Sequence, residues 1–468
     1  MPKAKQYAFF ISGSCVMLAS TLSSFGIATV TPALLQRFDA MRHYTLTSVM
    51  SSVGMLLFLP IVGKLTDTVG RKPMLLIGSI IAAVTSLATG FAPNFEVFIV
   101  MRLLITVGTT FCMPIPSATL PFIFERSKLP QLMGIQGSFL ALGTFFGSTI
   151  AGFLSDMGVA WMACAYPGIV ILIASLIMVY LCPDIPRKPL PSIDISGIIL
   201  LFLIIGPLSY VSSFSSQLGW GSTQIITMLV VMVAALIVFL FVEKRSKSPI
   251  VDLSLFKNRV FTGAMICVFS LVVYQTTMRI YAPLVIQRGL GMQAAASGSI
   301  LLPRSVLNIV CPAFCGAWIA KNHKARLWKG IAITGLLVAA GNLIMSFITL
   351  SSTLMVFFIG LGLTGVAESF KQASLVTTVQ NSLTAENMGS GISLNSMMGT
   401  LGATVSTCIY GLIFDNIAPD VSVTENLLSA SNVVHIISAL TGVIALVAAF
   451  LFIRPQKRGA EEDAKAAA

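Results

Sequence analysis

Five ionisable residues lie inside stretches of the sequence that are otherwise almost entirely apolar: Arg102, Arg279, Arg304, Glu368 and Lys371. Charged groups are costly in a hydrocarbon environment, so residues of this kind are functional candidates. The set contains a single carboxylate. Because a guanidinium binds a carboxylate or a sulfate through two parallel hydrogen bonds, the three arginines favour a binding site for an organic anion.

Each of these charges also has a structural explanation. Glu368 and Lys371 are three residues apart, so they can pair with each other on one face of a helix. Arg279 can reach an outer surface along its apolar stem, and Arg102 can be a structural or coupling residue. Arg304 is the hardest to explain in this way, because it lies near the middle of its apolar stretch. We therefore expect Arg304 to contact a ligand or to take part in coupling.

Apolar side chains are predicted to complete the binding site. Phe145 and Phe146 lie in one apolar stretch, and Met397 and Met398 lie in another. Aromatic and thioether side chains suit a bulky apolar ligand. Each of the four can equally be a core residue or a residue that faces lipid. With the cations, they predict an amphipathic organic anion as the ligand, with a bile-acid-like steroid acid as an example.

The composition identifies the environment of these residues. Of the 468 residues, 56% are hydrophobic and only 10% are charged, whereas about a quarter are charged in soluble proteins. Apolar stretches of about 20 residues, each long enough to cross a bilayer, recur along the chain. The predicted spans are 8–34, 45–65, 73–92, 95–118, 131–153, 162–182, 194–214, 223–242, 260–283, 295–319, 328–349, 353–378, 389–413 and 433–453. We predict an all-α integral membrane protein with fourteen transmembrane helices; weak separation near Trp220 leaves a thirteen-span alternative.

The positions of the positive charges predict the orientation. With the N-terminus in the cytoplasm and strict alternation of the spans, the outer loops contain only Arg37, Arg42 and Arg288, and the inner segments contain most of the 29 lysines and arginines. This distribution follows the positive-inside rule. The net charge of +12 is therefore an orientation signal, and no basic patch with interleaved aromatics indicates nucleic acid. We expect a multi-pass protein of the cell inner (plasma) membrane with both termini in the cytoplasm.

Several other functions find no support in the sequence. The eight cysteines lie almost entirely in apolar stretches, where they resemble small hydrophobic residues more than a disulfide framework. Cys311 and Cys315 share a helical face, but no histidine or carboxylate joins them, so we predict no metal. No nucleophile and base pair or phosphate loop indicates an enzyme, and we predict no cofactor.

An internal repeat divides the chain into two related halves. Gly63 recurs as Gly316 and Met133-Gly134 recurs as Met388-Gly389, at offsets of 253 and 255 residues. Asp67 of the first half has Ala320 as its counterpart. Parallel repeats of six helices are typical of secondary transporters. The predicted segments are 1–190 (six helices), 191–247 (two inserted helices), 248–456 (six helices) and 457–468 (a cytoplasmic tail).

The stretch 63–76 contains a dense group of glycines and charges between two predicted spans. We expect Gly63 and Gly70 to let two helices meet in a tight loop, and Asp67 to accept hydrogen bonds from a neighbouring helix end or from Arg71. Gly63, Asp67, Gly70, Arg71 and Lys72 have the spacing of the loop between helices 2 and 3 of the major facilitator superfamily, which the stretch resembles. The resemblance implies a motif that controls a conformational gate.

Further residues narrow the resemblance to one branch. Trp161, Asp194 with Gly197, Trp220, the stretch 248–259 and Leu301-Leu302-Pro303 together resemble the fourteen-helix drug:proton antiporters of the superfamily. This implies a transporter that exposes its site alternately to the two sides and uses the proton gradient, and we expect it to act as a monomer. Glu368 is then the first candidate for the proton carrier, with Lys371 and Arg102 as partners. Glu125 and Asp67, at cytoplasmic helix ends, are the second choices.

Two departures from that branch weaken the match to cation export. The first span reads Thr-Leu-Ser-Ser-Phe at 21–25, where exporters usually have a carboxylate. The fifth span reads Gly-Thr-Phe-Phe-Gly-Ser at 143–148 and lacks the proline that accompanies antiport. We therefore predict proton-coupled uptake of an amphipathic organic anion. A proton-driven multidrug efflux antiporter is the alternative within this class, and a non-transporting membrane sensor or scaffold is the alternative from another class.

Overall fold

The computed structural model describes residues 2–40, 44–183, 195–245, 252–278, 294–349, 354–418 and 424–455. Within these ranges the fold is all-helical and contains no strand. Ten helices among the described residues are long and apolar enough to cross a membrane. The predicted class, an all-α integral membrane protein, is confirmed.

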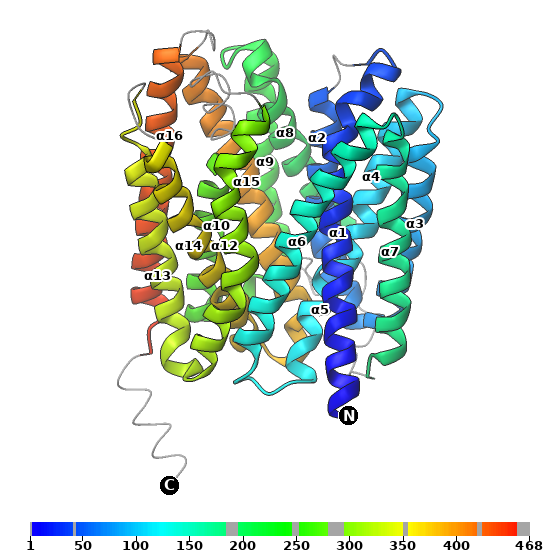
Figure 1. The fold of residues 1–468 in the computed structure, drawn as a ribbon, viewed down its shortest axis with the longest axis vertical. Helices are drawn as coiled ribbons and strands as arrows, with labels where there is room; N and C mark the ends of the chain where they lie inside the picture. The colour runs from blue at the N-terminus through cyan, green and yellow to red at the C-terminus, as the bar shows by residue number, and fades with distance from the viewer. Residues whose placement is uncertain are drawn as a thin grey trace.

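The helices before residue 190 form one bundle (Figure 1). Their bounds are α1 Lys3–Arg37, α2 Tyr44–Thr68, α3 Arg71–Gly90, α4 Phe95–Cys112, α5 Pro114–Thr119, η2 Leu120–Phe122, α6 Leu129–Asp156 and α7 Ala160–Leu181. The two helices that follow are α8 Ile195–Leu218 and α9 Thr223–Arg245.

The remaining helices form a second bundle beside the first (Figure 1). Their bounds are η3 Leu253–Lys257, α10 Arg259–Thr276, α12 Ala294–Ala320, α13 His323–Met345, α14 Leu354–Asn381, η6 Ala385–Asn387, α15 Met388–Ile417, α16 Thr424–Ala448 and the π-helical turn η7 Ala449–Ile453. We call the two groups the N-half and the C-half. Lys3 and Ile453 lie at the same end of the molecule, which we call the terminal end (Figure 1).

Two predicted spans differ in detail from the helices. The span predicted at 95–118 is divided, because α4 ends at Cys112 and α5 begins at Pro114, and proline cannot donate the backbone hydrogen bond that a continuous helix needs. The weakly separated region near Trp220 contains two distinct helices, α8 and α9. They are joined by a turn in which Gly219 has φ 78°, a conformation that favours glycine.

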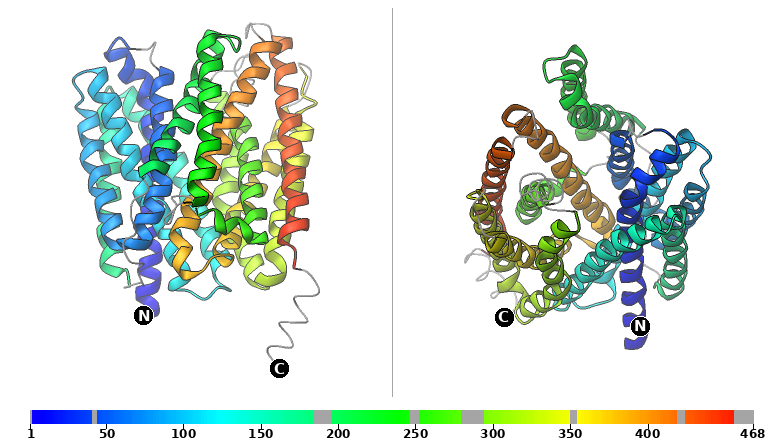
Figure 2. Two further views of the ribbon diagram at one scale, coloured as in Figure 1. Left: turned by 180° about the vertical axis from the view of Figure 1, so that it is seen from behind. Right: turned by 45° about the horizontal axis from the view of Figure 1, so that its top comes forward.

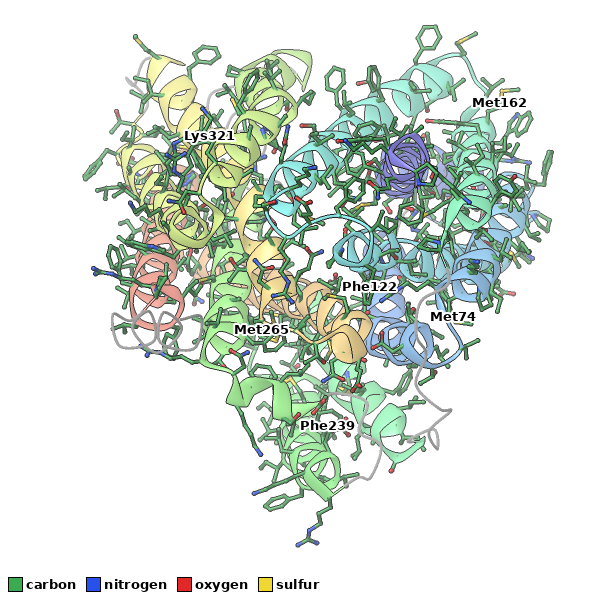
Figure 3. The ribbon with its side chains drawn as sticks, turned by 90° about the horizontal axis from the view of Figure 1, so that it is seen from below. Met74, Phe122, Met162, Phe239, Met265 and Lys321 are labelled. Atoms are coloured by element: carbon green, nitrogen blue, oxygen red, sulfur yellow. The ribbon has the colours of Figure 1, made fainter. Side chains whose placement is uncertain are left out.

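The helices α8 and α9 pack against each other on the outside of the two halves (Figures 2 and 3). Seen from the terminal end, Phe239 of α9 lies apart from Met74 and Phe122 of the N-half, and Met265 of the C-half lies nearer the centre (Figure 3). Many large apolar side chains of α9 are exposed, among them Val230 and Phe241. Such a helix is suited to contact lipid on most of its circumference.

Glycines bring the two halves together in two places. At the first crossing, of α2 with α15, a Cβ on Gly389 would lie 3.1 Å from the carbonyl oxygen of Gly63. At the second crossing, of α6 with α12, a Cβ on Gly134 would collide with the carbonyl oxygen of Pro312, and one on Gly316 would collide with that of Pro130. Small residues of this kind allow two helix backbones to approach closely.

The glycines of the two crossings are related by the internal repeat. Gly63 and Gly316 are counterparts in the sequence, as are Gly134 and Gly389, and each crossing pairs one glycine from each half. Each of the four lies near the end of its helix that is at the terminal end of the molecule. The conformation is therefore one in which the two halves are closed against each other at the terminal end. The exact boundaries of the predicted segments stay a prediction.

Candidate functional site

A buried carboxylate, Glu368 of α14, is the centre of a hydrogen-bonded cluster in the C-half. Its side chain is 3% exposed, and its Oε1 lies 2.8 Å from Nζ of Lys371. Tyr274 donates its hydroxyl to Oε2 at 2.6 Å, and Gln275 donates its amide to the same atom at 2.5 Å. Gln372 donates to Oε1 at 3.1 Å. The predicted pairing of Glu368 with Lys371 is confirmed.

The helices position this cluster through their periodicity and close packing. Residues 368, 371 and 372 share one face of α14, because residues three and four apart are neighbours on a helix. The opposing residues come from the end of α10 and from α12. A Cβ on Gly365 would lie 3.0 Å from the carbonyl oxygen of Arg304, and Ser369 donates its hydroxyl to Leu307 O at 3.2 Å. The glycine and the serine thus hold α12 tightly against α14.

Arg304 adds a second positive charge to the cluster. It is half-buried, and its guanidinium interacts electrostatically with both Glu368 and Tyr274. Its Nε is buried and has no hydrogen-bond partner among the described residues, and the same is true of Oδ1 of Asn308, one turn further along α12. Among the described residues, two cations therefore face one carboxylate here, and a buried donor of Arg304 has capacity left for a ligand.

The other predicted site residues lie elsewhere. Arg102 is 8% exposed in α4 of the N-half, where its charge acts on the Cys164 thiol of α7. Arg279 lies outside the described residues. Phe145 and Phe146 are 37% and 44% exposed on α6, with ring centroids 5.4 Å apart.

The two predicted methionines of α15 pack within the C-half. Met397 is 6% exposed and belongs to the main hydrophobic core, and Met398 packs against that core. The structure thus brings Arg304, Glu368 and Lys371 together. Among the described contacts, none joins Met397 to these three residues. A ligand-binding role for the two methionines stays a prediction.

Asp67 links the two halves at the first crossing. Its Oδ1 accepts the backbone N–H of Gly389 at 3.0 Å, and its Oδ2 accepts the backbone N–H and the hydroxyl of Ser390, both at 2.9 Å. Both residues belong to the first turn of α15, where unpaired N–H groups and the helix dipole favour a negative charge. Of the two partners predicted for Asp67, the helix end is the one that donates these hydrogen bonds.

The neighbouring motif residues have different roles. Gly70 has φ 108° at the start of α3, so the turn needs glycine as predicted. The expectation that Gly63 serves this turn is wrong: Gly63 lies within α2 and lets α15 approach, because a Cβ there would lie 2.7 Å from the Ser393 side chain. Arg71 is buried, and its Cζ lies 4.2 Å from the ring centroid of Phe122, while Lys72 is half-buried beside it.

A second polar contact between the halves was not predicted. Gln380 of α14 donates its amide to Ser117 O at 2.8 Å, and the Ser117 hydroxyl donates to Oε1 of Gln136 at 3.1 Å. All three side chains are buried. Single amides and hydroxyls within apolar helices give no periodic signal in the sequence. This contact is therefore recognised only in the folded protein, where the three side chains are buried together.

The comparison with known proteins decides the family. The sequence profile of the Major Facilitator Superfamily matches residues 13–407. The chain belongs to this superfamily. Its members are transporters, so the protein is a multi-pass membrane transporter and not an enzyme.

Relatives in bacteria carry names from drug resistance. The chain is 24% identical over 418 residues to the multidrug transporter protein MdtP of Bacillus subtilis, with 88% of this chain and 76% of the relative covered. It is 26% identical over 374 residues to the multidrug resistance protein Stp of Mycobacterium tuberculosis, with 77% and 67% covered. These relatives are consistent with the resemblance to the drug:proton antiporter branch.

Solved structures show the same fold. The human organic anion transporter MFSD10 (TETRAN) superposes with a TM-score of 0.69 at 14% identity, over 96% of this chain and all of that one. The proton:xylose symporter XylE superposes with a TM-score of 0.64 at 12% identity, over 97% of both chains. At these identities the likeness concerns the fold alone.

Proposed function

We propose that the protein is a proton-coupled transporter of an amphipathic organic anion. In this proposal it acts as a monomer without a cofactor and crosses the inner (plasma) membrane fourteen times, with both termini in the cytoplasm. Alternating access follows from rocking of the N-half against the C-half. The terminal end is then the cytoplasmic gate, and the present conformation has that gate closed.

The substrate class rests on one observation: the cluster at Glu368 contains two cations and one carboxylate, and Nε of Arg304 lacks a hydrogen-bond partner among the described residues. A carboxylate or sulfate of a ligand is the natural partner for that guanidinium. A cationic substrate would instead meet a site of net positive charge. In this proposal Phe145 and Phe146 of α6, a helix of the N-half that packs against both α12 and α14, supply apolar contacts for the body of the ligand.

Proton coupling follows from competition for the same cations. In the free protein, Lys371 and Arg304 are the positive charges that interact with Glu368. When the ligand's acidic group binds these cations, Glu368 loses electrostatic support and binds a proton more readily. One monovalent anion and one proton together leave the net charge of the cluster unchanged. The arrangement therefore favours movement of both in the same direction, which is uptake under an inward proton gradient.

The second candidate is a proton-driven multidrug efflux antiporter, which the names of the bacterial relatives favour. The two candidates differ in the sign of one effect. If anion and proton bind together, ligand affinity rises as the pH falls. If a cationic drug competes with a proton for Glu368, drug affinity rises as the pH increases.

The test uses proteoliposomes with an inward proton gradient. We expect accumulation of a labelled steroid carboxylic acid, which disappears when a protonophore collapses the gradient. Vesicles that fail to accumulate any amphipathic acid, yet transport a cationic dye against its gradient, would contradict the proposal and support the efflux antiporter.

A further inference from the structure

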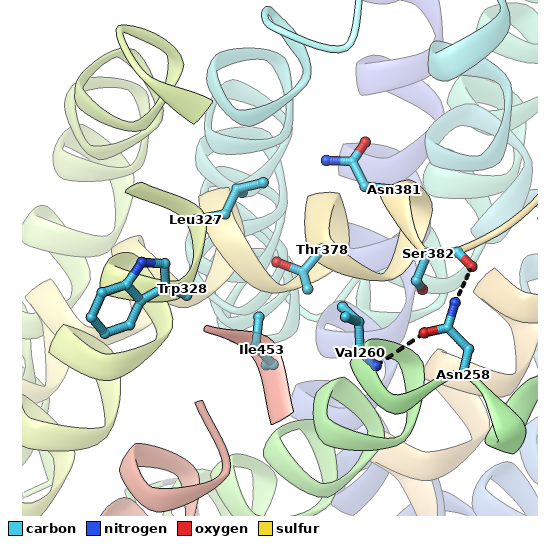
Figure 4. Close-up of a pocket in the computed structure, with 8 residues that line it drawn as sticks. All are labelled: Asn258, Val260, Leu327, Trp328, Thr378, Asn381, Ser382 and Ile453. Atoms are coloured by element: carbon cyan, nitrogen blue, oxygen red, sulfur yellow. Dashed lines mark hydrogen bonds between the residues drawn. The ribbon is translucent and has the colours of Figure 1, made fainter. Parts of the chain in front are cut away.

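A cavity separate from the Glu368 cluster opens at the terminal end of the C-half (Figure 4). Its volume is about 210 Å³. The polar side chains that line it are Asn258, Thr378, Asn381 and Ser382, and Trp328 forms an aromatic wall. Thr378 lies ten residues beyond Glu368 on α14, which corresponds to about 15 Å along the helix axis. The cavity is therefore not part of the proposed substrate site.

Three exposed cations are adjacent in sequence to residues that line this cavity: Arg259, Lys329 and Arg454. Cζ of Arg454 lies 5.4 Å from the ring centroid of Trp328, and Nζ of Lys329 lies 6.0 Å from it. Cζ of Arg259 lies 5.9 Å from the ring of Phe452. Arg454 and Lys329 thus lie beside the lining residue Trp328, and Arg259 lies against the segment that ends at the lining residue Ile453, where it also donates to Leu451 O.

The rim has no compensating negative charge within the part of the chain that the structure describes. None of the three cations there forms an ion pair with a carboxylate, in contrast to Lys371 in the Glu368 cluster. The lining side chains are neutral and include amide and hydroxyl groups (Figure 4). A site with this chemistry suits an anion that also presents hydroxyl or ester oxygens.

The location identifies the source of such an anion. The cavity is bordered by the beginning of α10, the first turns of α13, the end of α14 and η7, so it lies where apolar helices end. Tryptophan and basic residues at helix ends are typical of the membrane–water interface. Basic pockets between transmembrane helices at this level bind phosphate-bearing lipid head groups.

We propose that this cavity binds the phosphate head group of an anionic phospholipid. The phosphate lies among Arg259, Lys329 and Arg454, and the glycerol portion contacts the amide of Asn381 and the face of Trp328. The site is independent of the transported substrate, because it shares no residue with the Glu368 cluster.

The test measures binding of phosphatidylglycerol to the purified full-length protein by native mass spectrometry and by thermal shift in mixed micelles. Phosphatidylglycerol is expected to raise the unfolding temperature, and phosphatidylcholine is not. Each cation near an anionic lipid surface changes affinity by about fivefold. Lys329→Gln should therefore weaken binding about fivefold, and Asn381→Leu should weaken it by reducing the cavity.

Arg126→Gln is the matched control, because Arg126 is exposed at the same end of the N-half. Equal binding by the wild type, Lys329→Gln and Asn381→Leu would overturn the proposal, and so would a loss of binding in Arg126→Gln of the same size. Inorganic phosphate is the second probe. If it displaces phosphatidylglycerol and gives the same thermal shift alone, the cavity is a site for soluble phosphate and the lipid assignment is wrong.

Discussion

Asp67 and Glu368 are both buried carboxylates that accept several hydrogen bonds, but their partners differ in kind. Asp67 accepts bonds from the first turn of α15 in the opposite half, two of them from backbone N–H groups. Among the described residues, Glu368 accepts bonds only from side chains, and these belong to its own half. Backbone donors of another half leave only when the halves separate, whereas side-chain donors can turn towards a ligand.

This difference indicates that the two carboxylates have separate functions. Asp67 stabilises the closed terminal end, so its substitution should change the conformational equilibrium. Glu368 shares its cations with a ligand, so its substitution should change proton coupling. The second crossing lacks this contact, because the counterpart of Asp67 there is Ala320, whose methyl group cannot accept a hydrogen bond.

The largest effect is expected for Glu368→Gln. The amide keeps the shape of the side chain but cannot exchange a proton, so gradient-driven accumulation of the acid should fall to the level reached without a gradient. Transport in proteoliposomes measures this. Glu96→Gln, at an exposed position in the first turn of α4, should transport normally. Full proton-driven accumulation by Glu368→Gln would place the proton carrier elsewhere.

A smaller effect is expected for Arg304→Gln. Loss of a hydrogen-bonded charge costs roughly 1.5–3 kcal/mol, so affinity for the anionic ligand should fall about ten- to hundredfold. Arg304→Lys should retain the charge but lose the bidentate geometry, and it should show an intermediate affinity. Isothermal titration of the steroid acid measures both. Unchanged affinity in Arg304→Gln would make Arg304 a structural residue.

Asp67→Asn should shift the equilibrium between the closed and open forms of the terminal end towards the open form. It should not change the ligand affinity of either form. Asparagine keeps one acceptor oxygen but loses the negative charge, which is worth about 0.3–1 kcal/mol at a helix N-terminus, so the ratio of open to closed forms should rise roughly two- to fivefold. Spin labels at positions 126 and 321, on the two halves at the terminal end, measure this by the distance distribution between them. A distribution identical to that of the wild-type sequence would show that Asp67 does not hold the gate.

The smallest effect is expected for Ser390→Ala. It removes the hydroxyl donor at 2.9 Å but leaves both backbone donors to Asp67, so the same distance measurement should show a shift smaller than that of Asp67→Asn. Ser396→Ala is its control, because the Ser396 hydroxyl donates within its own helix to Ile392 O. A larger shift in Ser396→Ala than in Ser390→Ala would contradict the role of the first turn.

The sequence predicted the elements that depend on local pattern. Long apolar stretches predicted the helices, and charge spacing predicted both the Glu368–Lys371 pair and a helix end as partner for Asp67. The repeat related the four glycines to one another, but it did not predict that they lie at the two crossings. These features follow from periodicity, which is visible along the chain.

The sequence could not predict which distant residues meet. Tyr274 and Gln275 reach Glu368 because α10 ends beside α14. The contact of Gln380 with Ser117 depends on the closed conformation. In an apolar helix, the faces towards lipid and towards the core have similar composition, so periodicity does not distinguish them.

Proton uptake on ligand binding tests the account most directly. A steroid carboxylic acid, fully ionised at neutral pH, is added to the weakly buffered, solubilised protein while the pH is recorded. The account predicts uptake of about one proton per bound anion by the wild type and none by Glu368→Gln. Binding without proton uptake by the wild type, or equal uptake by Glu368→Gln, would contradict the proposed exchange of cations between Glu368 and the ligand.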